Sequence, residues 1–222
     1  MRLVKVITEL RFLNRLHLLK PYEDLHLAIL GQELKETDKV FAPGMVFDAK
    51  QKKIRTTLEL NRFAADLEDV PNIGHCVQTI SGTVKKVDDI VHLPRMSRVG
   101  IRSMWIEPST DKFEDLLGKY KEKMLKNNAI SEQAYDVGLV LDLHADGCKL
   151  NLTTGPMELQ QLKKQVLLFE PDQLPDLFVY VDADYATTSE SDYSGKFLND
   201  FIRQGLERGS EYAQTLFNVI KG

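Results

Sequence analysis

Two halves of this 222-residue sequence present the same order of patterns at matched spacings. An alternating strand pattern over 3–12 carries Arg11, and 11 residues after Arg11 a helical pattern begins with Tyr22-Glu23-Asp24-Leu25. A strand pattern over 98–106 carries Arg102, and Phe113-Glu114-Asp115-Leu116 begins a second helical pattern at the same distance. Further along, the segment 44–48 matches 138–142, and both enter a predicted hairpin at an Asp. The spacing predicts a tandem duplication of a β-α-β-β unit, against the alternative that two ordinary units resemble each other by chance.

The duplication divides the chain into a first half, 1–94, and a second half, 95–222, which ends in a long helical pattern over 191–220. Strands that alternate with helices at this spacing favour the α+β class, with mostly antiparallel sheet and helices on one face. A chain of this length buries roughly 70% of its unfolded surface, so both halves fit one continuous globular unit.

Individual segments carry more specific expectations. Hairpins are predicted over 40–60 and 135–154, and a strand over 176–185. The segments 75–84 and 88–93 are interpreted as strands and 157–164 as a short helix, while 62–70 is ambiguous, with a short helix as one interpretation. In the strand over 98–106, Trp105 lies on the apolar side and is predicted to be buried. Gly205 and Gly209 lie inside the last helix, where glycine costs about 1 kcal/mol, so close packing is predicted there.

Charge and cysteine content limit the classes of function. The sequence has 29 Lys and Arg against 33 Asp and Glu, a net charge of -4, which disfavours generic binding to nucleic acid or to an anionic membrane. No run approaches the roughly 20 apolar residues of a membrane-spanning helix. Two cysteines, Cys76 and Cys148, fit free thiols in a reducing compartment, so we expect a cytoplasmic protein.

Two short segments resemble a known family. Thr8-Glu9-Leu10-Arg11-Phe12 resembles the E-[IL]-R-F strand near the start of a sporadically distributed family of uncharacterised proteins in bacteria, archaea and phages. Arg98-Val99-Gly100-Ile101-Arg102 resembles the R-[IV]-G-[LI]-R strand in the middle of that family. The resemblance covers about ten residues and assigns no activity, cofactor or catalytic residue. It implies a role in accessory genes, such as mobile-element or anti-phage defence systems.

Arginines on two strands form the first candidate site. Arg98 and Arg102 share a strand face with Gly100, and Glu9 shares a face with Arg11. Guanidinium groups match the geometry of carboxylates and phosphates, so these residues are candidates for binding an anion or a partner. The missing side chain of Gly100 would let a ligand approach. The favoured alternative is a structural lattice in which Glu9 pairs with Arg102 or Arg98 across the sheet.

A second candidate site has the spacing D-x-H-x-D. Asp142 and His144 share a strand face and Asp146 lies in the following turn, so the three could ligate a metal through nitrogen and oxygen. The alternative is a polar hairpin edge, with Asp146 present because Asp-Gly suits the turn. The sequence contains none of the usual nucleophile, phosphate-loop, dinucleotide or zinc-protease motifs. We therefore expect neither catalytic residues nor a cofactor.

These observations favour a non-catalytic module that binds another protein or has a regulatory role. Two alternatives remain: a metal-dependent or hydrolytic enzyme that uses Asp142 and His144, and a sensor of small anions or nucleotides that uses Arg98 and Arg102. A homo-oligomer is left open, and neither a membrane nor nucleic acid is expected as a partner.

Overall fold

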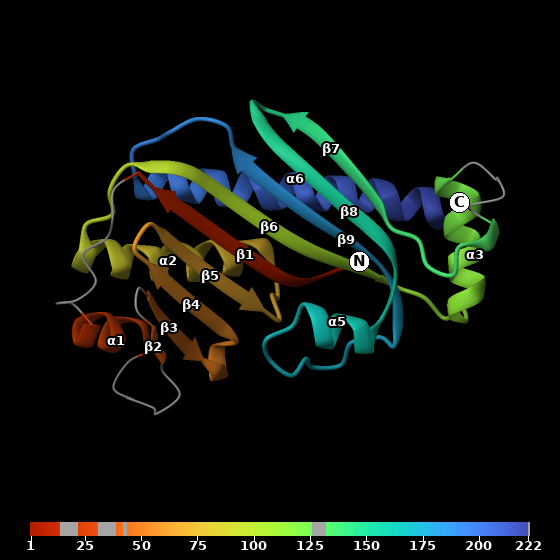
Figure 1. Ribbon diagram of the computed structural model, residues 1–222, viewed down its shortest axis with the longest axis horizontal. Coiled ribbons are helices and arrows are strands. Elements are labelled where there is room, and N and C mark those ends of the chain that lie inside the picture. Colours follow the sequence, from red (N-terminus) through yellow and green to blue (C-terminus); the bar gives the residue numbers. More distant parts are fainter. Residues whose placement is uncertain (14–21, 31–38, 42–43, 126–131, 222) are drawn as a thin grey trace.

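The computed structural model describes residues 1–13, 22–30, 39–41, 44–125 and 132–221, and these residues form one antiparallel sheet with helices (Figure 1). The strands are β1 (Arg2–Phe12), β2 (Lys39–Phe41), β3 (Gly44–Ala49), β4 (Ile54–Glu59), β5 (Arg62–Glu68), β6 (Met96–Pro108), β7 (Leu139–Ala145), β8 (Cys148–Glu158) and β9 (Leu177–Thr187). The helices are α1 (Tyr22–Leu30), α2 (Ile73–Val91), α3 (Phe113–Met124), α5 (Leu159–Gln165) and α6 (Gly195–Lys221), with a 3-10 turn, η1 (Lys50–Lys52). The predicted α+β class and long last helix are confirmed.

The nine strands follow the order β2-β3-β4-β5-β1-β6-β9-β8-β7, and every neighbouring pair is antiparallel. The long helices α2 and α6 lie behind the sheet in the view of Figure 1, and the main core fills the space between these two layers. Because side chains alternate along a strand, every second residue of the central strands faces this helix layer. On β6 these residues include Val99, Ile101 and Trp105. Trp105 is 5% exposed, which confirms its predicted burial.

The order of elements is the same in the two halves of the sequence. Apart from β2 and η1 in the first half and α5 in the second, the first half runs β1, α1, β3, β4, β5, α2, and the second runs β6, α3, β7, β8, β9, α6. The sheet places β1 and β6 side by side at the centre and repeats β5-β4-β3 on one side as β9-β8-β7 on the other. The divide at 94/95 falls between α2 and β6, and β1 pairs directly with β6 across it. The duplication itself stays a prediction.

The expected strands over 75–84 and 88–93 are wrong, because this segment is the single helix α2. Its buried residues follow the helical period: Cys76, Val77, Ile80, Val84 and Val87. The side chain of Asn72 accepts a hydrogen bond from the backbone N–H of His75 at 2.8 Å and so caps the first turn. The β-branched residues of this segment favoured a strand by composition, and the packing period overrides that preference.

Two further expectations are corrected. Residues 62–70 do not form a short helix, because β5 alternates between Arg62, Asp66 and Glu68 on one face and buried Phe63 and Leu67 on the other. The helix predicted over 157–164 begins only at Leu159, because β8 continues through Glu158. A capping box between Glu158 and Gln161 marks this change from strand to helix.

Helix α6 approaches the sheet closely at the two glycines of its interior, Gly205 and Gly209, which confirms the predicted packing. A Cβ atom on Gly205 would lie 2.0 Å from Cγ2 of Ile101, and one on Gly209 would lie 2.5 Å from Oγ of Ser103. Both contacts are far shorter than van der Waals distance, so no larger residue fits without movement of the helix. Gly118 in α3 differs, because a Cβ there would meet nothing within 4 Å.

We therefore expect Gly205→Ala to lower the free energy of unfolding by about 1–3 kcal/mol, the usual cost of overpacking a close contact. The control is Gly118→Ala, which adds helix propensity in open space and should stabilise by up to about 1 kcal/mol. Urea unfolding of the two variants against wild type measures both effects. Equal stability of Gly205→Ala and wild type would contradict the contact between α6 and β6.

Candidate functional site: the charged face of the sheet

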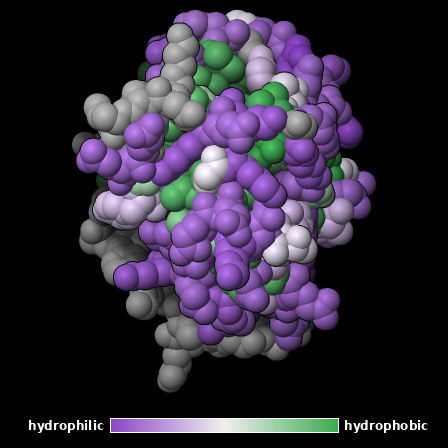
Figure 2. Space-filling model, turned by 90° about the vertical axis from the view of Figure 1, so that its right-hand side faces the viewer, coloured by the Kyte–Doolittle hydropathy of each residue, from purple (hydrophilic) through white to green (hydrophobic). Residues whose placement is uncertain are grey.

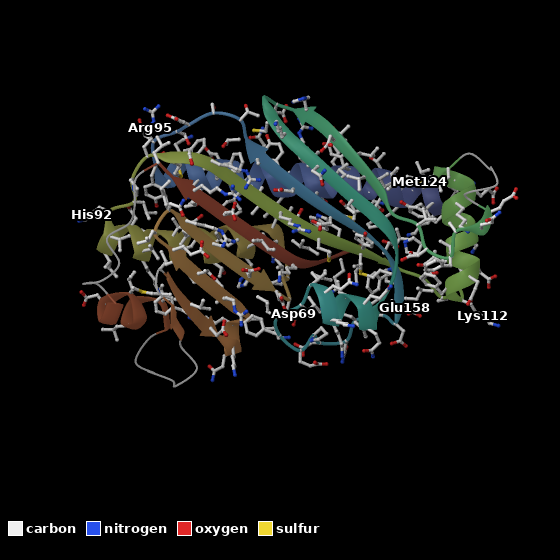
Figure 3. All side chains as sticks on the ribbon, in the orientation of Figure 1. Asp69, His92, Arg95, Lys112, Met124 and Glu158 are labelled. Carbon is white, nitrogen blue, oxygen red and sulfur yellow. The ribbon has the colours of Figure 1, made fainter. Side chains whose placement is uncertain are left out.

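The sheet face opposite α2 and α6, here called the open face, carries ordered charged side chains. Figure 3 shows these side chains on the near side of the strands, with α5 at one corner. The strand register aligns them in rows that cross the sheet. One row crosses eight strands through Asp48, Arg55, Asp66, Ile7, Arg102, Asp184, Asn151 and Asp142. Opposite charges are adjacent within this row at Asp48–Arg55–Asp66 and at Arg102–Asp184.

Glu9 is the centre of a cluster of arginines from three strands. Its carboxylate accepts hydrogen bonds from Arg11 Nε at 2.7 Å, Arg62 Nε at 2.6 Å and Arg98 Nη1 at 2.9 Å. Partial burial would raise the pKa of the Glu9 carboxyl, but the hydrogen bonds and charges of Arg62 and Arg11 outweigh burial and hold the pKa below its ordinary value. The cluster therefore keeps Glu9 ionised, and Arg62 and Arg98 also reach Glu59 and Asp184.

The guanidinium of Arg98 occupies the space above Gly100. A Cβ on Gly100 would lie 3.1 Å from Arg98 Nη1, and Arg98 Nη2 also lies 3.4 Å from Asp184 Oδ2. Arg98 thus bridges from β1 to β9 across the glycine of its own strand. The space that we assigned to an approaching ligand is filled by this side chain.

Arg102 binds a different carboxylate from Glu9. Its Nε donates to both carboxylate oxygens of Asp182, at 2.8 and 3.0 Å. The side chain of Asp182 is 8% exposed, whereas that of Arg102 is 55% exposed. Burial raises the pKa of neighbouring Asp184, although Arg98 and Arg102 oppose that shift. Of the two pairs that we expected for Glu9, the structure contains the one with Arg98 and not the one with Arg102.

Arg11 and Arg102 do not form a shared site, although we treated them as equivalent positions. Arg11 is opposite Arg98 and Arg62 in the register, whereas Arg102 is opposite Ile7. The row described above begins at Asp48 on one side of the sheet and at Asp142 on the other, and its two halves meet at the central pair Ile7–Arg102. The register therefore makes Ile7, and not Arg11, the counterpart of Arg102 when the two hairpins are matched.

A buried ion pair holds α5 against one corner of the open face. Lys5 Nζ contacts Glu68 Oε1 at 3.1 Å, and the two side chains are about equally buried, at 5% and 4% exposed. Lys5 also donates to the carbonyl of Val166 at 2.7 Å, and the backbone N–H of Leu168 donates to Glu68 at 2.7 Å. A small apolar cluster under α5 completes this corner: Val4, Met104, Ile106, Met157, Leu162 and Phe178. Outside this corner, the open face is not covered by α5.

The three candidate metal ligands do not meet in a metal-binding geometry. Asp142 Oδ1 accepts a hydrogen bond from Asn151 at 2.8 Å, and Asp146 Oδ2 accepts one from Arg208 at 2.7 Å. His144 is opposite Lys149 in the β7–β8 hairpin. Over the described residues, no three His, Cys, Asp or Glu side chains are grouped closely enough to hold a metal ion.

The cysteines are buried free thiols in the part of the chain that the structure describes. Burial raises the pKa of Cys76 to about 12, so its thiolate is scarce at neutral pH. This environment is that of a structural cysteine in the α2 core and not of a nucleophile.

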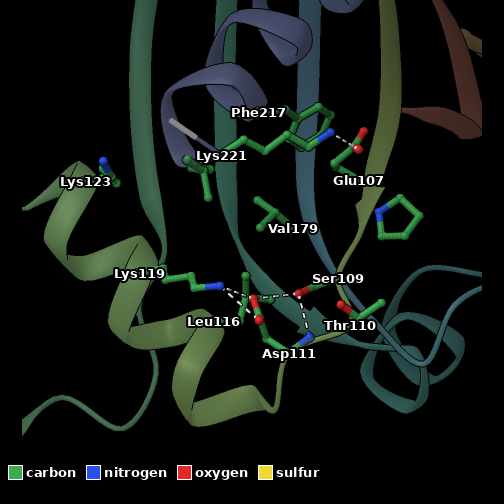
Figure 4. Close-up of a pocket in the computed structure, with 12 residues that line it drawn as sticks. Glu107, Ser109, Thr110, Asp111, Leu116, Lys119, Lys123, Val179, Phe217 and Lys221 are labelled. Carbon is green, nitrogen blue, oxygen red and sulfur yellow. Dashed lines mark hydrogen bonds and ion pairs between the residues drawn. The ribbon is translucent and has the colours of Figure 1, made fainter.

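A cavity of about 420 Å³ opens where α3 meets the end of α6 (Figure 4). Its floor is apolar, with Leu116, Val179 and Phe217, and its rim is charged. Four of the rim charges pair with each other, Lys119 with Asp111 at 2.8 Å and Lys221 with Glu107. Lys123 also lines the cavity and is not paired with any other residue drawn in Figure 4. Seen from this end, the surface is mostly hydrophilic, with small separate groups of apolar side chains (Figure 2).

Sequence reasoning missed Arg62 and Glu68 as members of the charged face. Period-two alternation over 62–68 was the available signal, and treating that segment as a helix concealed it. Asp182 and Asp184 were missed as partners of the arginines, because the pairing of β6 with β9 is not visible in the sequence.

Comparison with protein-family models found no match, and comparison with curated proteins found none either. No helix among the described residues is long and apolar enough to cross a membrane.

We expect Arg102→Ala to lower the free energy of unfolding by about 1–3 kcal/mol, because it leaves the buried Asp182 carboxylate without its guanidinium. This value lies between those of exposed and of fully buried ion pairs. The control is Arg11→Ala, which should cost less than about 0.5 kcal/mol because Glu9 keeps Arg62 and Arg98. Chemical unfolding curves compare the two. A larger effect for Arg11→Ala would contradict this assignment of the pairs.

The lowered pKa of Glu9 predicts a specific pH dependence. A carboxyl whose folded-state pKa lies below its unfolded value stabilises the fold above the unfolded pKa, about 4.3, and loses that contribution as the pH falls through the folded pKa. Glu9→Gln resembles the protonated state at every pH. The stability gap between wild type and Glu9→Gln should therefore be largest near neutral pH and shrink toward about pH 3. A gap that does not change with pH would exclude this role of the Glu9 charge.

Proposed function

We propose that this protein is a non-catalytic protein-binding module with a regulatory role, and that its binding surface is the open face of the sheet. One observation carries the proposal: an extended sheet face, outside the corner under α5, presents charged side chains in fixed positions. Cross-strand pairs hold these groups in place before a partner arrives, which lowers the entropic cost of binding.

The arrangement of charge favours a protein as the partner. Arginines are enriched at protein interfaces, and Arg11 and Arg102 expose more than half of their side chains. Nucleic acid requires a field of unneutralised cations, whereas the arginines here alternate with carboxylates. A protein surface with its own alternating charges is complementary to such a pattern.

The two alternative functions have less support from the geometry. An enzyme built on Asp142 and His144 would need Asp146, and its carboxylate is bonded to Arg208. A sensor built on Arg98 and Arg102 would need a small anion to displace Glu9 and Asp182 from them. The family resemblance at Thr8–Phe12 and Arg98–Arg102 favours a partner encoded by the same accessory genes, such as those of a mobile element or a defence system.

Site-specific photo-crosslinking in the native host tests the proposal. The crosslinking amino acid is placed at Thr57 and Thr153, which are half-buried residues on opposite sides of the open face. Control positions are Lys85 in α2 and Lys196 in α6, which are exposed on the helix layer.

We expect the same protein to be captured from Thr57 and Thr153 and not from the control positions. Combining each open-face crosslinker with Arg11→Ala should reduce capture, because Arg11 contributes charge to the surface and little to stability. Mass spectrometry identifies the captured protein. Capture only from the helix layer, or equal capture from both faces, would contradict the open face as the binding surface.

A further inference from the structure

The last strand of the sheet, β7, differs from its counterpart in the first half. The counterpart strand, β3, has its outer edge covered by β2, whereas β7 forms an edge of the sheet in the described part of the chain. Leu139, Leu141 and Leu143 point toward the helix layer but are only partly buried. Val140, on the open face, is 60% exposed. Exposed apolar edge strands favour pairing with another strand, so this edge requires an explanation.

The hairpin determines which backbone groups of β7 point outward. The turn residues Asp146 and Gly147 have φ values of 53° and 75°, as in the two-residue turns that close antiparallel hairpins. The flanking pair Ala145–Cys148 then exchanges backbone hydrogen bonds, and the pattern alternates along the ladder. Residues 143 and 141 therefore bond to β8, while 140, 142 and 144 direct their N–H and C=O groups away from the sheet.

The charges on β7 also differ from those on β3. Asp48 on β3 is bound at both oxygens by Arg55, at 2.6 and 2.8 Å. Asp142 is in the corresponding row, but its partner Asn151 is an uncharged amide. The Asp142 carboxylate thus keeps its negative charge at the edge, two residues from His144, which has Lys149 beside it.

We propose that β7 pairs in antiparallel fashion with β7 of a second copy of this chain, with Asp142 opposite His144 of the partner subunit. A two-fold axis at Leu143 produces this register, in which the outward groups of 142 and 144 bond to each other in both directions. The neighbouring register, centred on Asp142, places two aspartates opposite each other and is destabilised by like charge. The centre at Leu143 also brings the two Leu143 side chains together on the helix side.

The second copy would supply the strand that β7 lacks relative to β3, and the two sheets would become continuous. Self-complementary pairing explains why an aspartate and a histidine occur at the spacing that resembles a metal motif. This inference is independent of the proposed function, since it concerns the edge of the sheet and not the partner of its open face.

Charge exchange at the edge tests the register. Wild type should sediment at twice the 25.3 kDa of one chain and dissociate on dilution. Asp142→Lys removes the carboxylate that faces the His144 imidazole, and His144→Glu opposes two carboxylates at each contact, so each should weaken dimerisation, the second by about tenfold. The double variant Asp142→Lys with His144→Glu places a lysine opposite a glutamate at each contact and should recover the dimer.

The control is Asp200→Lys, an exposed charge reversal on α6, which should leave dimerisation unchanged. Melting curves show whether each variant remains folded, and amide exchange should be slower at 142 and 144 in the dimer than after dilution. A monomeric wild type at every concentration would overturn the proposal. Single variants that dimerise like wild type, or a double variant that fails to recover, would overturn the register.

Discussion

The close contact between α6 and the strands β6 and β9 determines how the rest of the molecule is arranged. Gly205 and Gly209 bring the helix backbone against Ile101 and Ser103, so the longest helix covers the centre of the sheet. Helix α2 lies beside α6 on the same face. With both long helices on one side, every second residue of the strands must face away from the main core. The charged groups on that face that are buried need partners there, because burying an unpaired charge is costly.

The open face meets this requirement by cross-strand pairing. The strength of its pairs varies with burial: Lys5 and Glu68 are enclosed under α5, whereas Arg102 and Arg11 are both about half exposed and differ in the burial of their carboxylate partners. Buried pairs fix positions and are costly to break, while exposed ones contribute little to stability. The buried ion pairs of the open face can therefore be structural, while its exposed arginines remain available to a partner. Stability and binding then depend on different members of one network.

Local patterns in the sequence were sufficient for the elements with strong periodicity. The alternation around Arg98–Arg102 predicted β6 and the burial of Trp105, and the helical stripe with two glycines predicted α6 and its close packing. The helix α2 was missed because its β-branched residues resemble a strand in composition. The pairs of the open face could not be assigned, because Glu9, Arg62 and Arg98 lie on three strands and meet only through the register.

The differences between the two halves separate structural from interaction roles. Where the halves correspond, as in the order of strands and helices, the shared features build the sheet and its helix layer. They differ where the surface differs: Arg55 neutralises Asp48 in one half, while Asn151 leaves the charge of Asp142 in the other. The outer edge of β3 is paired with β2, whereas β7 lies at the sheet edge within the described residues. In the second half, the charge of Asp142 therefore lies on the same strand, β7, that forms the accessible edge. Another chain can add to the sheet there without disturbing the core.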